Sequence, residues 1–518
     1  PSAVDALECA IAIQGELKTQ NEPLPDHRRM EFRIGINLGD VIAEEERIYG
    51  DGVNIAARVQ DLANAGGICI SGTTYDQVEN KVAVAYEYLG EHAVKNIAKP
   101  VRVYRIGAES ARVAVAAPGA ELAPPSVPSI AVLPFDNMSA DPDQEYFSNG
   151  IVEDLITDLS KIAGLFVIAR NSTFVYKGKP VKVQQVGRDL GVRYVLEGSV
   201  RKVGDRVRIT GQLVDASNGH HVWADRYDRR LDDVFAVQDE ITHNIVDALA
   251  VTLTRGDQQR SEGRRTDQIE AYDCLLRGLD YLNRSTREAN REAQRMFERA
   301  IELDADYAEA YAQLSRACFR DWTFGWTRDP QTLDRALELA ERAAALDDLL
   351  AAAHRSLGMV LLWKKAHQRA IAEARRAVSL APNDAESHYV LAEVSGWSHP
   401  NEAIASVQTA MRLNPHYPPN YLSTLGHSYY LMRRYEEAMT ELKRAINRNP
   451  DWLPAHAYLS ATYAELGRLD EAQAQMLEAR RISPQVSTTS LSGRLPYEDP
   501  VVLARVLGAF RVAGLSET

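Results

Sequence analysis

An asparagine and an arginine on one predicted helix are the residues best placed to do chemistry near the start of this sequence. Residues 48–71 (IYGDGVNIAARVQDLANAGGICIS) predict a glycine-rich turn, a helix and a strand. Asn54 and Arg58 are four positions apart, which places them on one face of that helix. A guanidinium can bind phosphate oxygens with two N–H groups, and an amide can hold a ribose or ring oxygen. The pair suits an anionic ligand, although the same spacing is also typical of a solvated helix face.

Four motifs follow one another through residues 1–106. They are RIGINLGDV (33–41), YGDGVNIAARV (49–59), GGICIS (66–71) and VKNIAKPVRVYRI (94–106). In order and spacing they resemble the second half of a class III adenylate/guanylate cyclase catalytic domain. The resemblance implies a partial α/β domain of ferredoxin-like palm fold. It also implies a homodimer with active sites at its interface, and conversion of ATP to cyclic AMP and pyrophosphate.

The resemblance assigns roles to four side chains. In that family one subunit gives two metal-binding aspartates, and the other gives an asparagine and an arginine that stabilise the transition state. These two catalytic residues map to Asn54 and Arg58, and a lysine that contacts the triphosphate maps to Lys95. Many members carry Asp or Thr seven residues before the asparagine. Here that substrate-binding position is Arg47, so the choice between ATP and GTP stays open.

The resemblance also implies Mg²⁺ or Mn²⁺, whose aspartate ligands precede the matched motifs in the family. PSAVDALECAIAIQGEL (1–17) resembles the helix that follows the metal-binding hairpin, so we expect the chain to begin inside the domain. Asp5, Asp26 and Asp40 do not occupy the motif positions. Since two metals are needed at the 3′-oxygen and the leaving pyrophosphate, we expect no metal site here and a catalytically incomplete chain.

A linker and a second α/β domain follow. Residues 107–128 are rich in Ala and Pro and hold few large apolar side chains, which predicts a linker. In residues 129–254, short apolar strands at 130–133 and 165–169 alternate with helices and predict some parallel pairing. Two longer alternating strands, 194–203 and 206–215, are joined at Gly204-Asp205, which predicts a hairpin.

The phrases IAVLPF, YVLEGSVRK, RITGQLVDA and HVWADRYDR lie within this second domain. They resemble the FlgO/TolB-amino-terminal-like domain of bacterial proteins, which implies a non-catalytic interaction or ligand-sensing domain. The tandem His220-His221 could suggest a metal site. No third ligand clusters with them, so we interpret the pair as part of a hairpin turn.

Residues 268–490 repeat a helical pattern with a period near 34. Six aligned alanines are separated by 43, 34, 33, 35 and 34 positions: Ala300, Ala343, Ala377, Ala410, Ala445 and Ala479. Two helices can cross closely only where a small side chain lets their backbones approach. This period and these anchors are the tetratricopeptide signature and predict an all-α solenoid. We interpret residues 491–518 as a C-terminal tail.

The first repeat interval is longer than the others because of an insertion at residues 320–332, which holds Trp322, Phe324 and Trp326. Two interpretations stay open. The aromatic side chains either pack inside a longer helix pair or form a ligand-contacting loop on one face of the solenoid.

Composition excludes several classes. The 518 residues carry a net charge of −13, which disfavours nucleic acid and anionic membrane as partners. The four cysteines lie far apart, so no disulfide framework is expected and a reducing, cytoplasmic location fits. No run of about 18 apolar residues exists, so we expect no membrane span.

Two functional hypotheses remain. In the first, the protein is an adenylate cyclase with an FlgO-like domain and a repeat solenoid as regulatory modules. In the second, it is a scaffold that binds an unknown protein on its solenoid, and its cyclase segment serves dimerisation or nucleotide sensing. A DNA-binding regulator with a similar repeat tail would need a basic helix-turn-helix, which the sequence lacks.

Overall fold

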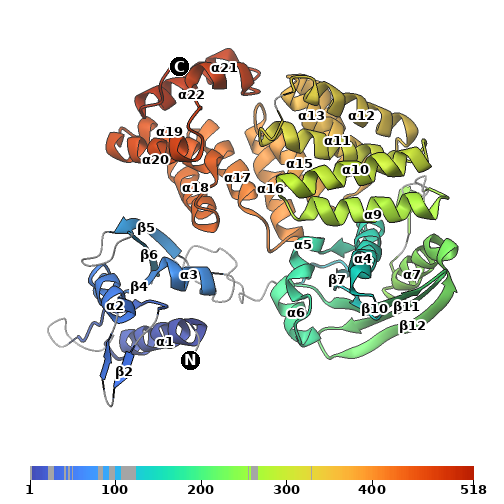
Figure 1. The fold of residues 1–518 in the computed structure, drawn as a ribbon, viewed down its shortest axis with the longest axis horizontal. Helices are drawn as coiled ribbons and strands as arrows, with labels where there is room; N and C mark the ends of the chain where they lie inside the picture. Colours follow the sequence, from blue (N-terminus) through green and yellow to red (C-terminus); the bar gives the residue numbers. More distant parts are fainter. Residues whose placement is uncertain are drawn as a thin grey trace. The chain divides into compact units, whose positions relative to one another are not determined.

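The structure is a computed structural model that divides into two compact units, residues 1–121 and 122–518 (Figure 1). It describes residues 3–21, 29–39, 42–44, 47–49, 51–79, 86–92, 100–106, 124–139, 141–251, 253–254, 256–257, 266–327 and 329–517. Within these ranges, no helix is both long and apolar enough to cross a membrane.

The first unit is built on a four-stranded sheet with the order β1-β4-β6-β5. Its strands are β1 (Ile34–Ile36), β4 (Ile68–Ser71), β5 (Tyr86–His92) and β6 (Val101–Ile106). β1 and β4 run parallel, and the other neighbouring pairs are antiparallel. A separate hairpin of β2 (Ile42–Glu44) and β3 (Arg47–Tyr49) lies between β1 and α2 in the chain. The helices are α1 (Ala3–Asn21), α2 (Asp51–Asp61) and α3 (Gly72–Val78). This is the α/β arrangement that the motifs predict.

Aromatic side chains fill the core of this unit. Tyr75 of α3 stacks on Tyr104 of β6 with ring centroids 3.8 Å apart, and the edge of Tyr86 meets Tyr75 at 5.2 Å. Leu7 of α1 is fully buried in the same cluster. The tyrosines therefore tie α1 and α3 to the sheet, and α2 packs on it separately through Val59 and Cys69.

The second unit begins with a sheet of order β12-β11-β10-β7-β9, in which β8 also pairs with β10. The strands are β7 (Ser129–Val132), β8 (Asp136–Asn137), β9 (Phe166–Val167), β10 (Tyr194–Val203), β11 (Arg206–Asp215) and β12 (His220–Arg230). β7 is parallel to both β9 and β10, and β10 forms an antiparallel hairpin with β11. Both the parallel pairing and the hairpin are confirmed.

Helices cover both faces of this sheet. α4 (Glu145–Ser160) and α7 (Val234–Ala248) pack on one face, and α6 (Val183–Leu190) packs on the other. The short α5 (Arg170–Thr173) follows β9. His220 and His221 begin strand β12 and are not in the turn as interpreted, because the reversal is completed at Gly219, whose φ is 76°.

The rest of the second unit is a solenoid of antiparallel helix pairs. The pairs are α9 (Ile269–Asn283) with α10 (Arg287–Leu303), α11 (Ala308–Thr323) with α12 (Thr332–Leu346), α13 (Ala351–Trp363) with α14 (His367–Leu380), α15 (Ala385–Ser395) with α16 (Pro400–Leu413), α17 (Pro419–Leu431) with α18 (Tyr435–Arg448), and α19 (Leu453–Glu465) with α20 (Leu469–Ile482).

The six aligned alanines occupy one equivalent position in the second helix of each pair. Each is at most 1% exposed, and its carbonyl accepts the N–H of the residue that ends the helix. Three of the matching first helices carry a glycine close to the partner helix: Gly278, Gly358 and Gly426. A Cβ on Gly426 would lie 2.6 Å from Leu442 of α18. Small residues on both sides therefore set the helix spacing, as the sequence predicts.

The segment interpreted as a C-terminal tail contains packed helices. α21 (Thr488–Arg494) and α22 (Pro500–Val512) continue the chain, and Val506 and Phe510 of α22 are buried against the last repeats. Arg494 donates to the carbonyl of Thr323 at 2.9 Å and lies over the ring of Trp322. The end of the solenoid thus contacts its second helix pair.

These contacts also bear on the aromatic insertion. Trp322 packs on Trp363 with ring centroids 5.2 Å apart, which supports internal packing for this residue. Phe324 and Trp326 stack on each other at 4.9 Å, and Phe324 remains 53% exposed.

The α/β domain of the second unit is fixed to the solenoid at three places. Gly150 of α4 meets Leu276 of α9, and Tyr146 donates to Asp273 of α9 at 2.6 Å. After α14, Asn383 donates from its side chain to the carbonyl of Ile162 at 2.7 Å. After α16, Asn414 accepts from Ser172 at 2.6 Å. Domain and repeats therefore form one compact unit.

Candidate functional site

The helix that carries Asn54 and Arg58 is seated directly on strand β1. A Cβ on Gly35 of β1 would lie 2.3 Å from the carbonyl oxygen of Ala56 and 2.4 Å from the backbone nitrogen of Gln60. Real Cβ atoms do not approach backbone atoms that closely, so only glycine fits at this position. On the same helix, Val59 is buried beside Cys69 of β4. Gly35 of the RIGIN motif thus allows α2 to pack at a short distance from strand β1.

A side-chain network fixes the beginning of the same helix. Asn37, just after β1, donates through Nδ2 to the carbonyl of Gly52 in the first turn of α2 at 3.0 Å. Its Oδ1 accepts from Thr73 of α3 at 3.2 Å, and Thr73 also donates to the carbonyl of Leu38 at 3.0 Å. Sequence reasoning did not identify Asn37 or Thr73 as positioning residues. Only the asparagine directly after a short strand could have indicated this role.

Asn54 and Arg58 lie on the outer side of α2, and both are exposed. Arg58 forms an ion pair with Asp61 one turn later at 3.3 Å, and its side chain is 59% exposed. Exposed pairs of this kind contribute at most about 1 kcal/mol. The guanidinium can therefore exchange Asp61 for a more highly charged anion such as a polyphosphate.

The described residues do not test the roles predicted for Arg47 and Lys95 in substrate binding. Arg47 lies in β3, two positions before the end of the hairpin strand. Lys95 lies outside the described residues. Their roles remain predictions from the resemblance.

The candidate metal ligands of this chain are its His, Cys, Asp and Glu side chains. Among the described residues, no three His, Cys, Asp or Glu side chains come together in a way that could hold a metal ion. Mg²⁺ prefers carboxylates in near-octahedral geometry. The described part of the chain therefore does not fit the metal pair of a cyclase.

Comparison with known protein families identifies the first unit. Residues 2–108 match the family described as "Adenylate and Guanylate cyclase catalytic domain". Residues 398–461 match "Tetratricopeptide repeat". The chain carries a cyclase-type α/β region and a tetratricopeptide solenoid. The match places Asn54 and Arg58 inside the cyclase segment.

The middle domain matches a different description from the one expected. Residues 126–244 match "HilA/YgeH-like transcriptional regulator, second domain". The FlgO/TolB-like assignment is not confirmed by this match and remains a prediction. The match concerns the α/β domain alone, since it ends before α9 begins.

One relative is similar to this chain well beyond the first unit. A protein of Rhizobium meliloti (strain 1021) named "Putative adenylate cyclase 3" is 46% identical over 369 residues, which are 70% of this chain and 62% of that protein. The chain thus spans less than two thirds of that relative. An uncharacterized protein of Mycobacterium tuberculosis strain H37Rv is 31% identical over 106 residues, 20% of this chain and 34% of its own length.

Among solved structures, an adenylate/guanylate cyclase/hydrolase from Silicibacter pomeroyi is 36% identical. It covers 21% of this chain and 65% of its own, with a TM-score of 0.21.

Proposed function

We propose that residues 1–106 supply the asparagine and arginine of a class III cyclase active site, and that the assembled protein converts ATP to cyclic AMP and pyrophosphate. The observation that carries this proposal is the exposed pair Asn54 and Arg58 on a helix seated on β1 at Gly35. An exposed amide and an exposed guanidinium on a fixed helix suit a nucleotide that is held by a second subunit. This supports a homodimer in which the site lies between subunits.

Each residue would act on a different part of the nucleotide. Asn54 would orient the ribose for attack by its 3′-hydroxyl on the α-phosphate. Arg58 would leave Asp61 and neutralise the charge that develops on the phosphates, which is the larger catalytic contribution. Lys95 would add a second cation at the triphosphate, and Arg47 would influence the choice between adenine and guanine.

Cyclases of this family use Mg²⁺ or Mn²⁺. Among the described residues no three such ligands come together, so we propose that carboxylates outside them complete the assembled active site. The ions would stabilise charge on the phosphate oxygens. What this chain's described residues contribute is the orientation of the ribose and the cationic face toward the triphosphate.

The second unit would then serve regulation. A solenoid offers an extended surface to a protein partner, and here its α/β domain is already fixed to the repeats at three places. A signal received by either part would reach the other through these three attachments.

The test is cyclic nucleotide production from ATP and from GTP with Mn²⁺. The 518-residue chain is compared with a version in which the strand and metal-binding hairpin of the cyclase family are fused before residue 1. Activity in the extended version alone would support the proposal. Silence in both would favour the alternative, a scaffold whose cyclase-type segment serves dimerisation or nucleotide sensing. That alternative would be distinguished by nucleotide binding and by the oligomeric state of the chain.

A further inference from the structure

The last repeats line a half-open cavity that the cyclase proposal does not use. It has a volume of about 210 Å³ and lies between α15, α17, α19 and the C-terminal segment. An apolar cavity of about 150 Å³ is enough to bind benzene. Leu491, Leu495 and Phe510 of the C-terminal segment form part of its wall. Because this segment covers part of the solenoid surface and the space is small, the cavity suits a small molecule rather than an extended peptide.

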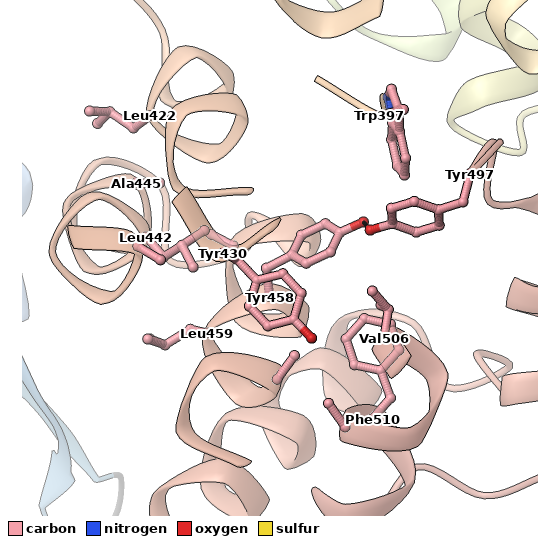
Figure 2. Close-up of a cluster of buried hydrophobic side chains, with 14 of the residues drawn as sticks. Trp397, Leu422, Tyr430, Leu442, Ala445, Tyr458, Leu459, Tyr497, Val506 and Phe510 are labelled. Atoms are coloured by element: carbon pink, nitrogen blue, oxygen red, sulfur yellow. Dashed lines mark hydrogen bonds between the residues drawn. The ribbon is translucent and has the colours of Figure 1, made fainter. Parts of the chain in front are cut away.

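Aromatic rings make up much of the lining. Trp363, Trp397, Trp452 and Tyr458 all face the cavity. Trp397 contacts His427 at 4.7 Å and Tyr497 at 4.9 Å between ring centroids. Figure 2 shows Trp397, Tyr458, Tyr497 and Phe510 converging from separate elements. The faces of such rings attract a positive charge, most strongly where water is excluded.

One carboxylate stands among these rings. Oε2 of Glu393 accepts from the hydroxyl of Thr424 at 2.7 Å and from that of Tyr389 at 3.4 Å. Both donors are neutral, and no ion pair to Glu393 occurs within the described residues. Burial raises the pKa of this carboxyl. Glu393 is half-buried, and its removal from water disfavours the ionised form. A cation bound beside this carboxylate would stabilise the ionised form.

Two arginines of the C-terminal segment have partners that do not line the cavity. Arg494 donates to the carbonyl of Thr323 at 2.9 Å, and Arg505 pairs with Glu465 at 3.3 Å. His427 also lines the cavity, but burial lowers its pKa to about 3, so it is neutral at physiological pH. The lining residues in the described chain include neither lysine nor arginine. When the Glu393 carboxyl is ionised, it therefore gives the cavity a negative charge.

Two further polar atoms point to a ligand. Oγ of Ser423 and the indole nitrogen of Trp452 are buried without a hydrogen-bond partner among the described residues, and both residues line the cavity. A buried N–H left unpaired is unfavourable, because it has lost its hydrogen bond to water. Indole can only donate, so its natural partner is a ligand oxygen.

We propose that this cavity binds a small arylalkylammonium ion that also carries an oxygen acceptor. The ammonium group would pair with Glu393, and the ring would pack among the tryptophans. The oxygen would accept from Trp452 or Ser423. The cavity selects by charge, because the same aromatic body without a positive charge leaves the carboxylate unpaired. This site and its test do not depend on cyclase activity.

The experiment uses the whole chain and two probes of almost equal shape. Tyramine carries the ammonium group, and tyrosol has a neutral hydroxyl in its place. Binding is measured by calorimetry and by tryptophan fluorescence, since three of the chain's six tryptophans line the cavity. We expect tyramine to bind at least about tenfold more tightly than tyrosol.

Glu393→Gln should abolish that preference, because it keeps the side chain's shape and removes its charge. Glu338→Gln, at an exposed carboxylate of α12, should leave the preference unchanged. Ala457→Leu, which adds side-chain atoms at the cavity wall, should weaken both probes. The proposal is overturned by equal affinity for the two probes, by a preference that survives Glu393→Gln, by unaltered binding to Ala457→Leu, or by no binding at millimolar concentration. A melting curve of each variant establishes that it is folded.

Discussion

Asn54 and Arg58 lie exposed on one helix of the first unit, whereas the polar groups of the second unit's cavity line a half-open space between helices. In the first case the helix is fixed and both side chains face solvent, where Arg58 pairs with Asp61. In the second, Glu393 and its neighbours are already oriented by hydrogen bonds and ring contacts. An exposed pair needs another surface to complete a site, whereas a lined cavity needs only a ligand. The difference separates the proposed part of a catalytic site from the proposed binding cavity within one chain.

The largest expected effect is at Arg58. In a version with a complete cyclase domain, Arg58→Ala should lower turnover about 100-fold or more, because the cation that stabilises transition-state charge is lost. Folding should be unaffected, since the side chain is exposed. The matched control is Arg33→Ala, another exposed arginine of the first unit. Turnover that is unaltered by Arg58→Ala would remove the assigned role.

The seat of α2 can be compared with a helix contact in the solenoid by the same substitution. Gly35→Ala places a Cβ against the backbone of α2, which cannot move aside, so we expect a loss of about 2–3 kcal/mol of local stability. Gly426→Ala meets the side chain of Leu442 at Cγ and Cδ2 before any backbone atom, and alanine also gains about 1 kcal/mol in a helix, so we expect a smaller loss there. Hydrogen exchange across residues 51–61 and 419–431 measures both. Equal protection losses would contradict the distinction.

The third prediction concerns pH and the cavity wall. The pKa of His427 is about 3 in the folded chain and 6.5 in its ordinary range, so the unfolded chain binds more protons between these values. Stability is therefore lost as the pH falls below 6.5. At pH 5 this one histidine accounts for a loss of about 2 kcal/mol.

His427→Gln should remove that part of the pH dependence in urea unfolding followed by tryptophan fluorescence. His243→Gln, at an exposed histidine of α7, is the control. If the two variants show the same pH dependence, His427 is not the group that titrates.

The smallest expected effect is at the closure of the solenoid. Arg494→Ala removes the bond to the Thr323 carbonyl and the contact with the Trp322 ring, at a cost of about 1 kcal/mol. We expect faster hydrogen exchange in α21 and little change in the other repeats. Arg511→Ala on α22 serves as the control. Unchanged exchange in α21 would mean that this contact does not hold the end of the chain.

The sequence could predict what depends on short spacing. The period of the aligned alanines predicts helix pairs, because each alanine packs against helices that are its neighbours in the chain. The strands at 194–203 and 206–215 were recognisable from alternation and a single glycine turn. Asn54 and Arg58 could be recognised because both lie on one motif.

What the sequence could not predict depends on residues far apart in the chain. The contact of Arg494 with Thr323 spans 171 positions, and that of Ser172 with Asn414 spans 242. Neither pair has a periodic signal. The helices of the C-terminal segment lie outside the repeat pattern, so the cavity that they help to line could not be predicted. Asn37 was missed because its function is to hold a backbone carbonyl.

The three attachments of the α/β domain constrain the number of repeats between them. They fall on α9, on the turn after α14 and on the turn after α16. In an open array, where each repeat meets only its neighbours, duplication or loss of a unit leaves the other contacts intact. Here a gain or loss of about 34 residues before α16 would shift one attachment away from its partner. We therefore expect relatives that keep the three attachments to keep the same number of repeats in this stretch.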